Sequence, residues 1–81
     1  MLLMQHVEVK AQVIIKGTVL DTIERKVLGN ASVNLLRVED SILLSTVRTD
    51  KNGQFQLKHN KDGQYLLMVS YPQYADYVDR L

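Results

Sequence analysis

Two turn signals set between alternating segments constrain the fold of this chain more than any other feature. Asp50-Lys-Asn-Gly53 and Asn60-Lys-Asp-Gly63 both combine residues that tolerate positive φ. The segments that flank them are rich in β-branched, aromatic and aliphatic residues. The first signal predicts a hairpin, and turn signals spaced roughly 8–12 residues apart predict a series of short strands.

Alternation of apolar and polar residues extends this prediction along the chain. Strands are expected over residues 11–20, 30–38, 42–49, 54–57, 65–71 and 77–81. Pro72 ends the fifth of these, because proline cannot donate to a sheet ladder. The fold class is therefore all-β, with two sheets packed as a sandwich. Its core is expected to contain Val13, Ile15, Gly17, Val19, Ala31, Val33, Leu35, Tyr65, Leu67, Val69 and Tyr71.

One segment departs from the strand pattern. Asp21-Thr-Ile-Glu24 has the form of a capping box, and Gly29 would serve as a C-terminal stop. The apolar residues at helical spacing are Leu20, Ile23 and Val27. These residues fit either a helix of about two turns or an irregular connection. We favour the connection, because an isolated helix this short is marginally stable in water.

Length and charge limit the classes of function. A chain of 81 residues supports one small domain with a single core. Ten basic and nine acidic residues are interspersed, so a nucleic-acid partner is not expected. No apolar run reaches the roughly 18–20 residues that span a bilayer, so direct membrane insertion is not expected either. We expect residues 1–10 to be a leader remnant or a disordered N-terminus, with an extra strand as the alternative, and residues 11–81 to form the domain.

Residues that could carry chemistry are sparse. His6 and His59 have no neighbouring carboxylates at ligand spacing. Asp50-Lys-Asn-Gly53 resembles the opening of a calcium loop, but Lys61 stands where such a loop places its bidentate glutamate. No nucleophile with a base and an orienting group can be nominated. The sequence therefore predicts no catalytic residue, no cofactor and no metal site, and the chain is not expected to be an enzyme.

Four segments in order resemble the carboxypeptidase regulatory-like domain. They are Ile15-Lys-Gly-Thr-Val-Leu-Asp21, Leu28-Gly-Asn-Ala-Ser-Val33, Thr49-Asp-Lys-Asn-Gly-Gln-Phe55 and Gly63-Gln-Tyr-Leu-Leu-Met-Val-Ser-Tyr71. The resemblance covers about residues 12–74 and implies a seven-stranded, transthyretin-like Greek-key sandwich. With Leu36-Arg-Val-Glu-Asp-Ser-Ile-Leu-Leu44 included, the chain looks most like the copies at the N-terminus of outer-membrane β-barrel proteins and TonB-dependent receptors of Bacteroidetes-type bacteria. Tyr71-Pro-Gln-Tyr74 departs from the Tyr-x-Gly-Tyr that is usual in the family.

The resemblance implies a non-catalytic accessory domain of a larger exported protein, on the periplasmic side of the outer membrane or at the cell surface. Its partner would be a protein, either the rest of the parent chain or an envelope protein, and a homo-oligomer is also open. Two alternatives belong to other classes. One is a carbohydrate- or peptide-binding module of a secreted enzyme. The other is a small transthyretin-like hydrolase, although Tyr77-Val-Asp-Arg-Leu81 lacks the Tyr-Arg-Gly-Ser ending of those enzymes.

Several apolar residues fall on the strand faces opposite the expected core. A small domain that exposed them together would present an apolar patch of the kind used for partner contact. The alternatives are that some strands bury both faces, or that a bulge reverses the face of a strand. The opposite faces carry Ile14, Leu20, Leu36, Leu44, Leu66 and Met68. The interaction surface is predicted to include Ile14, Leu36, Leu66, Met68, Tyr74 and Tyr77.

Overall fold

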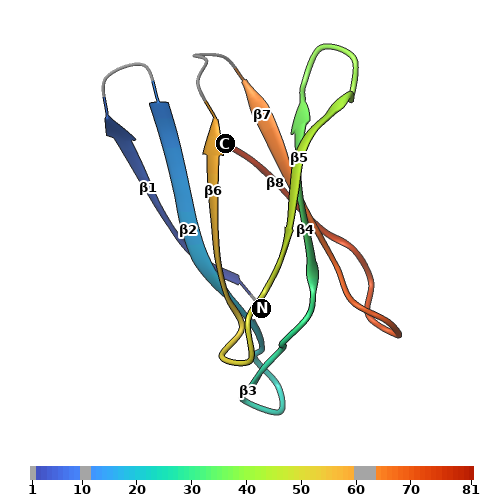
Figure 1. Cartoon of the computed structure of the whole chain (residues 1–81). Helices are drawn as coiled ribbons and strands as arrows, with labels where there is room; N and C mark the ends of the chain where they lie inside the picture. Colours follow the sequence, from blue (N-terminus) through green and yellow to red (C-terminus); the bar gives the residue numbers. More distant parts are fainter. Residues whose placement is uncertain (1, 10–11, 60–63) are drawn as a thin grey trace.

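The computed structural model describes residues 2–9, 12–59 and 64–81, and the side chains of residues 14–59 and 64–81. It is an all-β sandwich of two sheets, as the alternation predicts (Figure 1). Seven strands lie between Gln12 and Arg80, and one more precedes them. The strands are β1 (Leu2–Val9), β2 (Gln12–Asp21), β3 (Lys26–Val27), β4 (Ser32–Arg37), β5 (Leu43–Arg48), β6 (Gln54–His59), β7 (Tyr65–Ser70) and β8 (Tyr77–Arg80).

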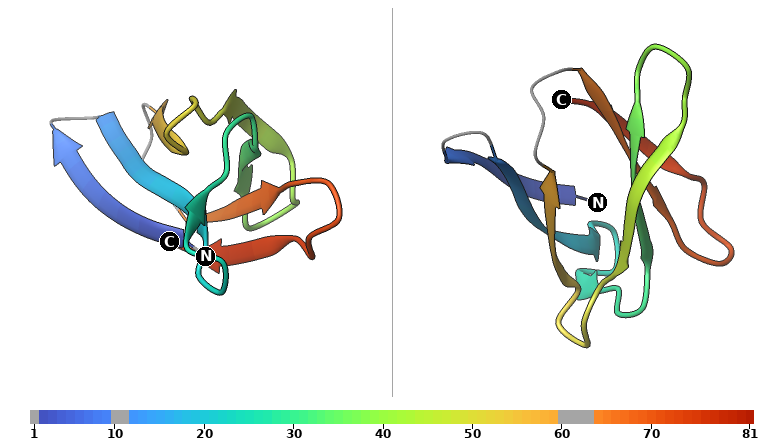
Figure 2. Two further views of the ribbon diagram at one scale, coloured as in Figure 1. Left: turned by 90° about the horizontal axis from the view of Figure 1, so that it is seen from below. Right: turned by 45° about the horizontal axis from the view of Figure 1, so that its top comes forward.

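The strands are divided between two antiparallel four-stranded sheets. One sheet runs β1-β2-β3, with β6 also paired to β2, and the other runs β5-β4-β7-β8. The two layers face one another and approach most closely at the end that carries the β2–β3 and β5–β6 turns (Figure 2). The described residues include no helix with the length and apolar character that crossing a bilayer requires.

The N-terminal segment forms a strand in the structure. Leu2–Val9 pairs along β2, with Leu2 opposite Val19 and Val9 opposite Gln12. This is the extra strand that the sequence leaves open as the alternative to a leader remnant or a disordered terminus. The boundary between residues 1–10 and the domain stays a prediction.

The core consists of the inward residues of both sheets. Eight of the expected core residues are buried: Ile15, Val19, Ala31, Val33, Leu35, Tyr65, Leu67 and Val69. Tyr71 packs against this core from its margin, Gly17 is only half-buried, and the side chain of Val13 lies outside the described side chains. Leu28, Phe55 and Leu57 complete the buried set. Burial of these apolar side chains is the main favourable term for a chain without cysteine.

The prediction of a hairpin at Asp50–Gly53 is wrong in one respect. The turn closes as expected, because Gly53 N donates to Asp50 O over 2.9 Å and Asp50 Oδ1 accepts from Asn52 N and Gln54 N at 2.8 and 3.0 Å. However, β5 pairs with β4 and β6 pairs with β2. The turn therefore carries the chain from one sheet to the other instead of joining two paired neighbours.

The segment after β2 is a turn, which agrees with the expected connection and not with a helix. Asp21 Oδ1 accepts from Ile23 N and Glu24 N at 2.9 and 3.0 Å, as a capping side chain does. Arg25 then adopts a φ of 55°, and the chain enters the short strand β3. Asp21 therefore makes the hydrogen bonds of a capping residue, as the sequence predicts, but they close a single turn and no helix follows.

Gly53 fixes the position of the crossing turn against β2. Its φ is +75°, and a Cβ at this position would lie 2.6 Å from Val19 O. Its own carbonyl accepts from Val19 N at 2.7 Å. A side chain at residue 53 would therefore have to move the turn away from β2 and disturb this hydrogen bond.

We expect Gly53→Ala to lower the free energy of unfolding by about 2 kcal/mol or more, because it adds both a left-handed backbone penalty and a backbone clash. Urea denaturation followed by circular dichroism measures the change. Asn52→Ala is the matched control, since Asn52 is exposed in the same turn. Equal stability of the two variants would contradict the prediction.

Candidate interaction surfaces

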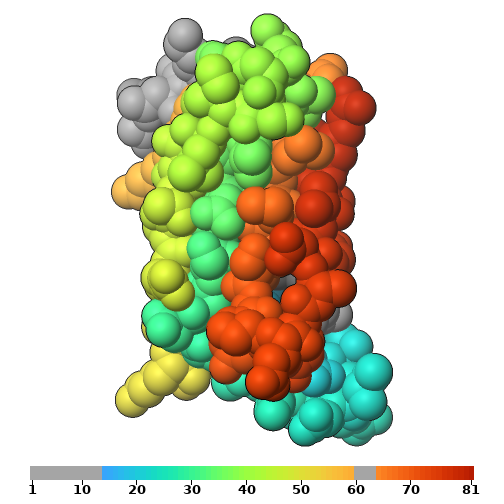
Figure 3. All heavy atoms as spheres, turned by 90° about the vertical axis from the view of Figure 1, so that its right-hand side faces the viewer, coloured from blue at the N-terminus to red at the C-terminus, as the bar shows by residue number. Residues whose placement is uncertain are grey.

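Apolar residues gather on the outer face of the sheet β5-β4-β7-β8. Leu36 lies opposite Leu43 on one side and Leu66 on the other, and Met68 lies opposite Val78. Residues directly opposite in an antiparallel pair share a face. Leu43 and Val78 are 53% and 56% exposed, while the other three are half-buried. We call Leu36, Leu43, Leu66, Met68 and Val78 the outer apolar patch. The four strands that carry it lie side by side on this face (Figure 3).

A β-bulge decides which leucine of β5 belongs to this patch. The register steps from Leu35 opposite Ser45 to Leu36 opposite Leu43, so Leu44 is the extra residue on β5. Leu44 packs against the core. The expectation that Leu44 faces outward is therefore wrong, for the reason that a bulge reverses the alternation.

Polar side chains occupy the rest of the same face. Asn34 Oδ1 accepts from Thr46 Oγ1 at 2.8 Å, and Asn34 Nδ2 donates to Met68 O at 3.3 Å. Ser32 and Ser70 lie opposite one another in the next row. Two members of the patch have polar neighbours in their own rows, because Arg80 lies opposite Leu66 and Asn34 lies opposite Met68. Polar residues therefore border the patch on this face.

The structure brings together three of the six residues that the sequence predicts for an interaction surface. Leu36, Leu66 and Met68 lie in the outer apolar patch. Ile14 lies on β2 in the other sheet, opposite Lys58, and is half-buried. Tyr74 and Tyr77 pack against the margin of the core.

Val78 and Leu43 are exposed members of the patch that the predicted interaction surface does not include. Val78 follows Tyr77 on β8, and alternation from the inward Tyr77 would have placed it on the outer face. Leu43 could not have been found in this way, because the bulge at Leu44 breaks the alternation on β5.

Tyr74 links the β7–β8 connection to the end of β2. Its hydroxyl donates to Asp21 Oδ2 over 2.5 Å, while Asp21 itself is buried. The hydrogen bonds from Tyr74 and from Glu24 N hold the pKa of Asp21 below its usual value, although burial acts in the opposite direction. The same hydrogen bond, together with burial and the charge of Asp21, raises the pKa of Tyr74 to about 12. The sequence predicted Tyr74 at the surface but gave no signal for this partner.

A hollow of about 690 Å³ lies where β5 and β6 diverge from their connecting turn. Its lining is mixed: Lys16 and Thr18 come from β2, Val47 and Arg48 from β5, and Phe55 and Gln56 from β6. Asp50 also lines it, but one oxygen of that carboxylate already accepts two backbone N–H groups.

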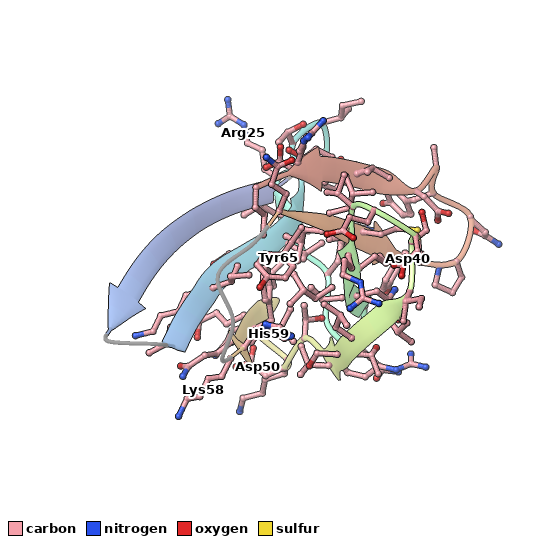
Figure 4. All side chains as sticks on the ribbon, turned by 90° about the horizontal axis from the view of Figure 1, so that it is seen from above. Arg25, Asp40, Asp50, Lys58, His59 and Tyr65 are labelled. Atoms are coloured by element: carbon pink, nitrogen blue, oxygen red, sulfur yellow. The ribbon has the colours of Figure 1, made fainter. Side chains whose placement is uncertain are left out.

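His59 contacts an aromatic partner across the sandwich. Its ring lies 5.0 Å from that of Tyr65 at an interplanar angle of 62°, and Tyr65 Oη is 3.1 Å from His59 Nδ1 (Figure 4). This contact joins β6 of one sheet to β7 of the other. Within the part of the chain that the structure describes, no group of three or more His, Cys, Asp or Glu side chains could hold a metal ion. The side chain of His6 lies outside the described side chains.

Comparison with known families decides what kind of domain this is. Residues 14–80 of the 81 match the carboxypeptidase regulatory-like domain. The chain belongs to that family. No curated protein and no solved structure shows significant similarity to it. The match begins inside β2, so β1 lies outside it. Carboxypeptidase regulatory-like domains are generally non-catalytic accessory domains.

The Asp21–Tyr74 hydrogen bond gives this carboxypeptidase regulatory-like domain a pH-dependent contribution to stability. The lowered pKa of Asp21 contributes stability above the unfolded value of 3.8, and this is lost as pH falls through the folded pKa. The raised pKa of Tyr74 contributes stability below the unfolded value of 10.0, and this is lost as pH rises to about 12. Both contributions are present between these limits.

We therefore expect Tyr74→Phe to lower the melting temperature on the order of 5 °C near neutral pH, with a smaller difference from wild type below pH 4 and above pH 10. Thermal unfolding followed by circular dichroism across that range measures it. Tyr77→Phe is the control, because Tyr77 also packs against the core but makes no comparable bond among the described residues. A decrease in melting temperature that stayed the same at every pH would contradict the pH-dependent role of the Asp21–Tyr74 hydrogen bond.

Proposed function

We propose that this chain is a docking domain of a larger exported protein of the outer-membrane receptor type, and that it adheres to protein through the outer apolar patch. The observation that carries the proposal is the patch itself, in which leucine, methionine and valine side chains adjoin across four strands. Membership of a generally non-catalytic accessory family supports an adhesive role. The resemblance of the sequence to the N-terminal copies of TonB-dependent receptors supports the receptor context and the periplasmic side as its location.

The proposed partner is the rest of the parent polypeptide. Leu43 and Val78 expose about half of their surface and lie at opposite edges of the patch, on β5 and β8. A protein surface that covered both would also cover the half-buried Leu36, Leu66 and Met68 between them. Removing this apolar area from water would favour association at roughly 25 cal/mol per Å² before the costs of binding.

The first test is the downstream reading frame, which is expected to encode plug and barrel domains. The second mixes the purified domain with that downstream polypeptide and measures affinity by calorimetry. We expect the double variant Leu43→Glu/Val78→Glu to weaken binding at least tenfold, because each carboxylate would have to be buried against apolar surface. Its melting temperature should change little, since both residues are exposed.

Ile23→Glu is the matched control for these substitutions. Ile23 is 91% exposed on the β2–β3 turn, outside the patch, so the same change of chemistry there should leave the affinity unaltered. Equal affinities of the double variant and wild type would overturn the role of the patch. A downstream frame without plug and barrel would overturn the receptor context.

A further inference from the structure

The hollow beside β6 lies at two free sheet edges. β6 pairs with β2, β5 pairs with β4, and no strand among the described residues pairs with the second edge of either. The two strands leave the Asp50–Gly53 turn in diverging directions in both views (Figures 1 and 2). The space between them is the hollow of about 690 Å³. A free edge is a template for an added strand.

The hydrogen bonds at the turn show which backbone groups β6 directs to its free edge. Gly53 O accepts from Val19 N on β2, so residues 55, 57 and 59, at even spacing from Gly53, also direct their backbone groups toward β2. Gln54 N and O instead bond to Asp50, away from β2. By the same alternation, Gln56 and Lys58 direct their N–H and C=O groups to the free edge. These N–H and C=O groups recur at every second residue, which is the spacing at which an added antiparallel strand would pair with β6.

The side chains around this edge give the hollow its charge. Lys16 and Arg48 line it and are exposed, and Lys58 is exposed on β6 two residues beyond Gln56. Lys58 projects away from the interior that holds Tyr65 (Figure 4). Asp50 is the one acidic residue of the lining. Val47 and Phe55 add apolar surface between the basic groups.

We propose that this hollow is a second protein-binding site, which takes an extended acidic segment as an added strand on β6. Main-chain hydrogen bonds to Gln56 and Lys58 would supply part of the affinity, as in other cases of strand addition. Lys16, Arg48 and Lys58 would select acidic side chains at alternating positions of the ligand, and Val47 and Phe55 would accept a small apolar one. The site shares no residue with the outer apolar patch and does not depend on it.

The probe is a capped heptapeptide, Thr-Glu-Val-Glu-Val-Glu-Thr, titrated into the isotope-labelled chain. We expect backbone amide signals of Gln56 and Lys58 to shift on binding, and the affinity to fall as salt is raised. The same peptide with lysine in place of glutamate is the ligand control and should not bind. Lys16→Glu/Arg48→Glu should weaken binding roughly tenfold, by loss of attraction and gain of repulsion. Lys51→Glu on the turn, outside the lining, should leave it unchanged.

Gln56→Pro separates strand addition from simple charge attraction. The variant removes an N–H that faces the free edge, where an edge strand tolerates proline, and it leaves all basic residues in place. Binding should be lost while the circular dichroism spectrum is retained. Unchanged binding by Gln56→Pro, or equal binding of the lysine peptide, would overturn the proposal. These results are independent of the Leu43→Glu/Val78→Glu test, so either site can fail alone.

Discussion

The passage of the chain between the two sheets at Thr49–Gly53 is the constraint on which the rest of the structure depends. Thr49 is buried; its Oγ1 accepts from Ala31 N at 2.8 Å and donates to Leu28 O at 2.7 Å. A buried backbone group without a partner costs about 1–3 kcal/mol, so this hydroxyl satisfies two groups that would otherwise oppose burial of the 28–31 connection. Gly53 then brings the chain against Val19. Together the two residues hold the crossing segment against the 28–31 connection and β2.

The strands and the core could be predicted from the sequence because burial of every second residue is a local pattern. Ile15, Val33 and Leu67 each lie in such a pattern, and each is fully buried. The partner of a strand is not a local property. Asp50-Lys-Asn-Gly53 satisfies the backbone of a turn equally well whether the next strand lies in the same sheet or the opposite one. Only the packing of Thr49 and Gly53 against residues 18 to 34 positions earlier selects the crossing.

The same distinction explains the candidate surfaces. Leu36, Leu66 and Met68 could be predicted as outward residues, since β4 and β7 pair without interruption. The choice between Leu43 and Leu44 depends on a shift of register against β4, and the role of Tyr74 depends on Asp21, which lies 53 residues away in the sequence. Neither the register shift nor the Tyr74–Asp21 hydrogen bond can be predicted from composition or from the spacing of residues. The hollow likewise arises from two edges that belong to different sheets.

The bulge at Leu44 makes the surface of this domain sensitive to the length of the β4–β5 connection. That connection is held by hydrogen bonds from Arg37 N to Ile42 O and from Ser41 N to Arg37 O. A change in the length of this connection that removed the bulge would exchange the inward and outward leucines of β5, while the pairing of β4 with β7 stayed intact. Related domains could thus present different outer faces through loop length, without any substitution in the interior.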